Sequence, residues 1–156
     1  MIELSPEKKI KFARPNYFQG ILQLRNVNKE VIDFVRQQIN KRDDVAITKI
    51  VRQPNGFDYY ITSQKYIQTI GKKLRESFGG FLKTSSRLHT RSRTGKDLYR
   101  VNVLFRISQY KAGSVVNIRG DNYKIIRMGY KIFAKEVKTG RKKTLRVEDL
   151  PGERHL

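Results

Sequence analysis

The chain has 156 residues and a formal net charge of +20, because 34 lysines and arginines outnumber 14 aspartates and glutamates. No cysteine is present, which excludes disulfides and cysteine-based zinc sites, and no apolar run reaches the ~20 residues that a membrane-spanning helix needs. An aromatic share of 10% is too high for a disordered polycation, so the composition indicates one or two small folded units whose positive field attracts anionic partners.

Residues 1–16 form a basic lead-in, in which Pro6 and Pro15 disfavour a helix. Beyond it, apolar residues recur with the periods of strands and helices up to residue 107. The predicted strands are 20–24, 45–52, 57–61, 81–93 and 98–107. The first predicted helix follows Asn28 and ends near residues 41–44, and the second covers 63–78. This order predicts an α+β domain at 17–107, of split-βαβ type, with two helices covering one face of a mostly antiparallel sheet.

Both predicted helices carry terminal signals. Asn28 can accept a hydrogen bond from the first turn of its helix, as an N-cap does. Thr62 or Ser63 can do the same for the second helix. That helix should end at Gly79, because glycine adopts the left-handed conformation that closes many helices.

Residues 108–150 show no helical periodicity and instead alternate short strands with turns. The expected strands are 114–119, 123–130, 131–138 and 144–147, separated by turns at 120–122 and 139–140. This pattern predicts a small SH3-like β-barrel at 108–150, followed by a C-terminal tail at 151–156. With about 43 residues the barrel lies near the ~40-residue size below which a core is rarely sufficient alone, so we expect it to lean on the first domain or on a partner.

The two long strands that end the first domain are expected to form a hairpin with charge concentrated on one face. Pairing around residues 94–95 places His89 opposite Arg100 and Leu82 opposite Ile107. Because side chains alternate along a strand, this register gathers cations on one face and apolar residues on the other. The predicted cationic face comprises Lys83, Arg87, His89, Arg91, Arg93, Arg100 and Arg106, with Lys96 beside the turn.

Like charges that face each other across a sheet destabilise it. The simplest explanation of the cationic face is an ordinary solvated surface. Such surfaces normally intersperse positive and negative side chains, however, so we favour a face that binds RNA. A second basic cluster surrounds the predicted turn at 139–140, and it can be either an RNA probe or a charged edge hairpin that prevents aggregation. The candidate RNA-binding residues of this cluster are Lys131, Lys135, Lys138, Arg141, Lys142, Lys143 and Arg146.

Catalysis is not expected from the sequence. The two histidines, His89 and His155, are far apart, and no motif for a phosphate-binding loop, a dinucleotide or a nucleophilic serine is present. Acidic residues occur in adjacent pairs, but nothing supplies the convergent carboxylates of a metal-dependent nuclease. We therefore predict a non-enzymatic protein that uses no cofactor and no metal.

The segments 17–25, 46–80 and 98–101 carry a recognisable order of residues. In them the chain resembles the nonsense-mediated mRNA decay protein three family in its archaeal form, and the resemblance extends over roughly residues 16–150. It implies an adaptor that binds rRNA on the intersubunit face of the nascent large ribosomal subunit, in the P-site and E-site regions toward the L1 stalk. The implied partners are large-subunit rRNA, ribosomal proteins near the E site and L1 stalk, and other late assembly factors.

The resemblance also bears on the architecture. It implies a domain akin to a eukaryotic large-subunit ribosomal protein, followed by a barrel like that of translation factor five A. Family members usually begin with a cysteine-rich zinc region, which is not found here, so we expect either a fragment or a form without that module. We further expect a cytoplasmic monomer that does not bind membranes.

Other functions stay open at this point. An integral ribosomal protein would share the charge and the small domains, but it would be stoichiometric on translating ribosomes. An RNA-modifying or RNA-cleaving enzyme would alter or cut rRNA on incubation. Binding to anionic membranes is disfavoured, because the helix at 63–78 uses its apolar face for the core.

Overall fold

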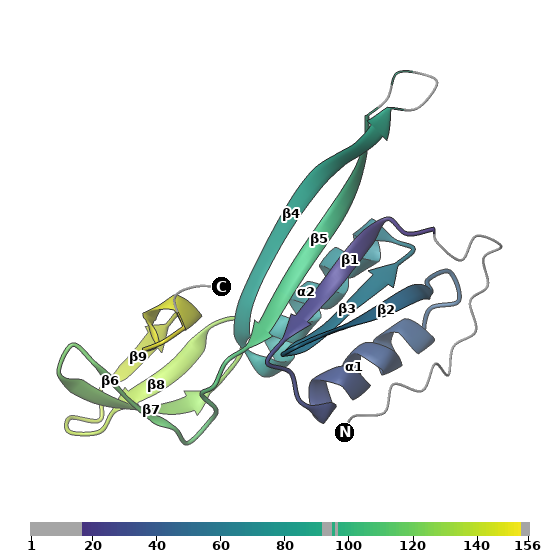
Figure 1. Cartoon of the computed structure of the whole chain (residues 1–156). Coiled ribbons are helices and arrows are strands. Elements are labelled where there is room, and N and C mark those ends of the chain that lie inside the picture. The colour runs from purple at the N-terminus through teal and green to yellow at the C-terminus, as the bar shows by residue number, and fades with distance from the viewer. Residues whose placement is uncertain (1–16, 92–94, 96, 154–156) are drawn as a thin grey trace.

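The computed structural model describes residues 17–91, 95 and 97–153, which form two units (Figure 1). The first is a five-stranded sheet with two helices, and the second is a four-stranded antiparallel sheet. The α+β fold predicted from the sequence is confirmed, and the four antiparallel strands fit the predicted small barrel.

The central strand of the first unit is β1, with β3 on one side and β5 on the other, in the order β2-β3-β1-β5-β4. The strands are β1 (Gly20–Arg25), β2 (Ile47–Gln53), β3 (Gly56–Ile61), β4 (Gly80–Arg91) and β5 (Asp97–Ile107), and the helices are α1 (Lys29–Asn40) and α2 (Gln64–Phe78). Neighbouring strands are antiparallel except β1 and β5, which run parallel. This parallel pair arises because α2 leads into β4 at the edge of the sheet, and β5 then returns between β4 and β1.

Local signals set the helix ends as predicted. Asn28 and Ser63 each accept a hydrogen bond at 3.1 Å from the backbone of the first turn of their helix. Thr62, the alternative cap, instead accepts a hydrogen bond from the backbone nitrogen of Ala46 at 3.0 Å. Gly79 ends α2 with a φ of 68°, in the region that favours glycine.

A buried apolar layer between the helices and the sheet forms the core of the first unit. Its fully buried members, at 0% exposure, are Leu22, Leu24, Val31, Ile32, Val35, Tyr59, Ile61, Ile67, Ile70, Leu74, Val103 and Phe105. Each such aliphatic side chain contributes about 1.5–3 kcal/mol of stability by leaving water. Within the described residues, no helix combines the length and apolarity that crossing a membrane requires.

The Tyr59 hydroxyl is buried in this core and has no hydrogen-bond partner among the described residues. Because an unsatisfied buried hydroxyl costs about 1–3 kcal/mol, we expect Tyr59→Phe to raise the free energy of unfolding by about 1 kcal/mol at neutral pH, measured by urea denaturation. Burial raises the pKa of Tyr59 to about 12 from 10.0, although the charge of Arg36 opposes this shift.

The raised pKa gives the same substitution a second readout. The neutral phenol is preferred in the folded state, so its contribution to stability is complete below pH 10.0 and is lost as the pH rises toward about 12. The native protein should therefore lose more stability over this interval than Tyr59→Phe does. A less stable variant at neutral pH, or identical alkaline losses, would contradict this account.

The β4–β5 hairpin has a different register from the predicted one. Arg87 lies opposite Arg100, whereas the sequence pattern had placed His89 there, so the predicted register is wrong by two residues. A shift by an even number preserves the alternation, and the predicted separation of cationic and apolar faces therefore holds up to Leu88. A bulge between Leu88 and Thr90 interrupts that alternation toward the tip.

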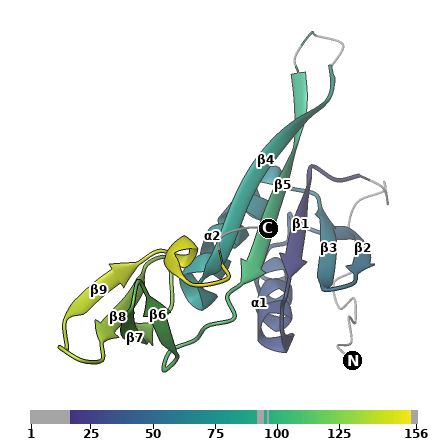
Figure 2. The ribbon, with the colours of Figure 1, turned by 60° about the vertical axis from the view of Figure 1, so that its left-hand side comes forward.

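The hairpin projects beyond the remaining strands and away from the second unit, as both views show (Figures 1 and 2). Leu88 and Tyr99 lie opposite each other there, on the apolar face of the hairpin. Each is 50% exposed, and neither is among the apolar side chains packed against the core of the first unit. The hairpin arm is therefore accessible to a partner on both faces.

The second unit is a meander of four strands with a short 3-10 helix. Its elements are β6 (Val115–Ile118), β7 (Asp121–Arg127), β8 (Ile132–Glu136), β9 (Lys142–Leu145) and η1 (Val147–Asp149). Arg119 and Gly120 make the tight β6–β7 turn, with φ of 52° and 91°. Phe81 of β4 packs against the core of this unit, so the small unit leans on the first domain, as its size predicts. That core contains Val116, Tyr123, Ile125, Ile132, Ala134, Leu145, Val147 and Leu150.

A buried ion pair connects the two units. The Glu153 side chain is only 1% exposed, and its carboxylate lies 3.1 Å from Arg106 Nη1 on β5. The same carboxylate accepts hydrogen bonds from Ser108 Oγ at 3.0 Å and from the backbone nitrogen of Gln109 at 2.8 Å. The segment after η1 is thereby tied to the end of β5.

Candidate nucleic-acid interface

The face of the five-stranded sheet that the helices leave uncovered is called the open face below. The register places Lys49, Tyr60, Ile21, Asn102 and Ser85 in one row across β2, β3, β1, β5 and β4. Lys49 Nζ lies 5.3 Å from the centre of the Tyr60 ring. The open face thus combines cationic and aromatic side chains, as surfaces that bind RNA commonly do.

One acidic side chain on the open face is neutralised within the chain. Asp58 Oδ1 lies 2.8 Å from Arg25 Nη1, and Asp58 Oδ2 accepts a hydrogen bond from Gln53 Nε2 at 3.0 Å. Asp58 therefore balances Arg25 and is not available to the cations of β4 and β5.

Arg87 and Arg100 lie directly opposite each other on neighbouring strands. The Arg100 guanidinium lies 3.8 Å from the centre of the Phe18 ring, and Phe18 meets Tyr60 edge-on with a centroid distance of 4.7 Å. Lys83 and Arg87 are exposed. No ion pair joins Lys83, Arg87 or Arg100 to a carboxylate in the part of the chain that the structure describes. Since like charges directly opposite each other on neighbouring strands destabilise a sheet, an external anion would stabilise this part of the open face.

Arg106 does not belong to the available cations. Its side chain is 13% exposed and is paired with the Glu153 carboxylate, while Nη2 donates a hydrogen bond to the Glu153 carbonyl oxygen at 3.3 Å. The prediction that Arg106 presents an unneutralised charge to RNA is therefore wrong, because a carboxylate of the same chain compensates it.

The other predicted cations near the hairpin tip stay predictions. His89 and Arg91 belong to β4, but the structure does not describe their side chains. Arg93 and Lys96 lie outside the described residues.

A second basic surface lies on the outward face of the four-stranded sheet. Lys124 lies opposite Lys135, and Lys135 lies opposite Lys142, so a lysine row crosses β7, β8 and β9. All three side chains are exposed, and none forms an ion pair within the described ranges. The nearby Glu136 carboxylate accepts a hydrogen bond from Thr139 Oγ1 at 2.6 Å, which shapes the turn at 139–140.

The remaining predicted cations of the second cluster surround this lysine row. Lys143 Nζ lies 5.2 Å from the centre of the Tyr123 ring. The backbone nitrogen of Arg146 donates to Asp149 Oδ2 at 2.9 Å and so starts η1, which leaves the side chain exposed. The exposed members are Lys131, Lys138, Arg141, Lys143 and Arg146.

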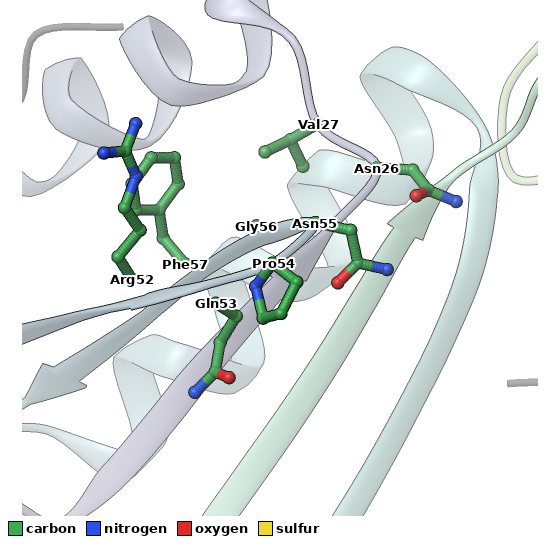
Figure 3. A pocket seen from close by; sticks show the side chains of 8 residues that line it. All are labelled: Asn26, Val27, Arg52, Gln53, Pro54, Asn55, Gly56 and Phe57. Atoms are coloured by element: carbon green, nitrogen blue, oxygen red, sulfur yellow. The ribbon is translucent and has the colours of Figure 1, made fainter. Parts of the chain in front are cut away.

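A hollow of about 490 Å³ beside the β2–β3 turn offers no catalytic group (Figure 3). Its lining consists of Asn26, Val27, Arg52, Gln53, Pro54, Asn55, Gly56 and Phe57. Amides, apolar groups and one guanidinium supply neither a general base nor a set of metal ligands. Elsewhere in the described residues, no three His, Cys, Asp or Glu side chains are grouped to hold a metal ion.

Two residues of these surfaces were not among the site residues predicted from the sequence. Phe18 precedes the periodic pattern of β1, and nothing local shows that it lies beneath Arg100. Lys124 did carry a signal, because it alternates with the buried Tyr123 and Ile125 and must therefore point outward.

The part of the chain that matches a known family contains the sheet that bears the open face. The family model NMD3, second domain, matches residues 17–107, more than half of the chain. These residues include all five strands of the first sheet and both helices. No curated protein matches the chain significantly.

Proposed function

Because the chain belongs to the NMD3 family of ribosome-related adaptors, we propose that it is a non-enzymatic biogenesis factor that binds rRNA of the large ribosomal subunit. The observation that carries this proposal is the pairing of cations with cations across neighbouring strands. Arg87 faces Arg100 in the hairpin, and the lysine row crosses the second unit. Phosphates of a folded RNA would supply the missing counter-charge, and such contacts position a protein without reading sequence.

The proposed location is the intersubunit face, across the P-site and E-site regions toward the L1 stalk. The open face and the lysine row lie on different units, which allows one molecule to contact rRNA at two places. The protein would act as a cytoplasmic monomer beside other late assembly factors and ribosomal proteins near the E site. It would do so without a cofactor.

Fractionation of cell extract on a sucrose gradient tests this function. The protein should sediment with free large subunits and be absent from complete ribosomes. Stoichiometric amounts on translating ribosomes would instead identify an integral ribosomal protein. Nucleotides altered or cut when the pure protein is incubated with rRNA would identify an enzyme.

Charge reversal on the open face should weaken binding to purified large subunits. We expect Lys83→Glu with Arg87→Glu to reduce the affinity about tenfold or more, because each charge-assisted contact contributes about 1.5–3 kcal/mol. The dependence of log affinity on log salt should also become less steep by about two, since two fewer phosphates are neutralised.

The matched control reverses two exposed lysines of α2, Lys65→Glu with Lys72→Glu, which changes the net charge equally on the side of the domain away from the open face. Co-sedimentation of this control should match the native protein. Equal losses in both variants would mean that only net charge matters and would refute the open face as the contact surface.

A further inference from the structure

A small hollow lies between the start of β1 and the hairpin, and most of its lining belongs to the open face. It has a volume of about 170 Å³ and is lined by Phe18, Ile21, Arg87, Leu88, Arg100 and Asn102. Sites for whole ligands usually enclose about 300–1,000 Å³. A hollow of this size therefore suits one planar ring with its attached anion rather than an extended ligand.

Arg100 is held in place before any ligand arrives. Its guanidinium stacks on Phe18 at 3.8 Å, and the Phe18 ring is braced edge-on by Tyr60. The Nε atom of Arg100 is buried and has no hydrogen-bond acceptor in the described residues. Because a ligand cannot reach an atom that has no accessible surface, an external acceptor would bind the outer Nη groups of this guanidinium.

Arg87 supplies a second guanidinium at the same place. It lies directly across from Arg100 in the register and is exposed. Guanidinium groups bind phosphate through paired N–H donors, and a phosphate between Arg87 and Arg100 would relieve their repulsion. Arg87 and Arg100 therefore form the part of the site that would bind the anion of the ligand.

The rest of the lining fits a nucleobase. Ile21 offers apolar surface on the open face, and the half-exposed Leu88 borders the hollow from the apolar face of the hairpin. A guanidinium plane such as that of Arg100 is a platform on which unpaired bases stack. The Asn102 carboxamide carries both donors and an acceptor, and no hydrogen bond of its side chain is present in the described part of the chain. Such an amide can pair with the polar edge of a base.

We propose that this hollow binds a single unpaired nucleotide of structured RNA, with its phosphate between Arg87 and Arg100 and its base over Ile21, at the edge that Leu88 borders. This inference rests on the proposed function, since it takes RNA as the partner. It adds that the open face recognises a nucleotide displaced from a helix, rather than helical backbone alone. A free mononucleotide offers the same chemistry, and the experiment separates the two sources.

Fluorescence anisotropy with two labelled RNA hairpins tests the inference. The hairpins are identical except that one carries a single bulged nucleotide, and adenosine monophosphate serves as competitor. We expect the native protein to prefer the bulged RNA about tenfold, the scale on which one base stacks on a protein surface. The mononucleotide should compete only at far higher concentration.

Two variants test whether the preference for the bulged RNA depends on the hollow. Arg100→Lys keeps the charge but loses the planar group on Phe18, and Leu88→Ala removes exposed apolar surface without touching the core. Both should bring the preference close to one, and Leu88→Ala, which changes no cation, should leave the affinity for the paired hairpin within about twofold. The control Val137→Ala truncates another exposed apolar side chain, on the second unit, and should keep the preference.

Each of the other outcomes would refute one part of the proposal. Equal binding of both hairpins by the native protein would refute the nucleotide site and leave the proposed function standing. No binding to either hairpin or to large subunits would refute the proposed function itself. Competition by the mononucleotide at the concentration of the RNA would refute RNA as the source of the bound nucleotide.

Discussion

Replacing Glu153 with alanine will lower the free energy of unfolding by about 3–5 kcal/mol and loosen the second unit from the first. The Arg106 guanidinium, 13% exposed, would then be buried without its counter-charge. Ser108 Oγ and the backbone nitrogen of Gln109 would lose their acceptor in the same step. The penalty is large because the groups left behind stay buried and unpaired.

Urea denaturation measures the loss, and hydrogen exchange locates it. Exchange should accelerate across β6 to β9 and change little in β1 and β3, whose hydrogen bonds belong to the other sheet. Glu148→Ala is the matched control, because this carboxylate is exposed in η1, and its removal should change stability by no more than about 0.5 kcal/mol. Arg106→Ala added to Glu153→Ala should cost little more, since the two side chains act as one pair.

Gly56→Ala is expected to destabilise the first unit by about 3 kcal/mol or more. A Cβ atom at Gly56 would overlap the Leu24 carbonyl oxygen, which belongs to the central strand β1. Backbone in the middle of a sheet does not yield as the end of a flexible side chain does. The close approach continues beyond β1, where the backbone nitrogen of Asn26 donates to the Asn55 carbonyl at 2.8 Å.

Thermal unfolding checks this prediction, with a fall in Tm of about 10 °C expected for a chain of this size. The control is Gly113→Ala, because a Cβ atom there meets nothing within 4 Å. The only cost at this position is the backbone strain of an alanine at a positive φ of 95°. That strain amounts to about 1–2 kcal/mol. Equal effects at both glycines would show that conformational freedom, rather than the approach of Leu24, explains Gly56.

Signals within single elements were sufficient to predict the helices. Asn28 and Ser63 cap the helices that the sequence assigned to them, and Gly79 ends α2. A cap depends on residues three or four positions apart, so its evidence is contained in a short stretch of chain. The apolar spacing of α1 and α2 likewise predicted which residues enter the core.

The register of the β4–β5 hairpin could not be predicted from the alternating pattern of the sequence. Alternation has a period of two, so it predicts which face a side chain occupies but does not distinguish registers that differ by two residues. The Arg87–Arg100 pair and the predicted His89–Arg100 pair satisfy the pattern equally well. The bulge between Leu88 and Thr90 accounts for one of these two residues, and no apolar pattern announced it.

By itself the sequence determined the α+β class, the two covering helices and an excess of cations on β-strands. Only the tertiary structure decided which of those cations are free. Arg106 meets Glu153, 47 residues later in the chain, whereas Arg100 meets the ring of Phe18 and no carboxylate among the described residues. Periodicity, caps and turns record interactions between near neighbours, and pairings such as β1 with β5 join distant segments whose contact exists only after folding.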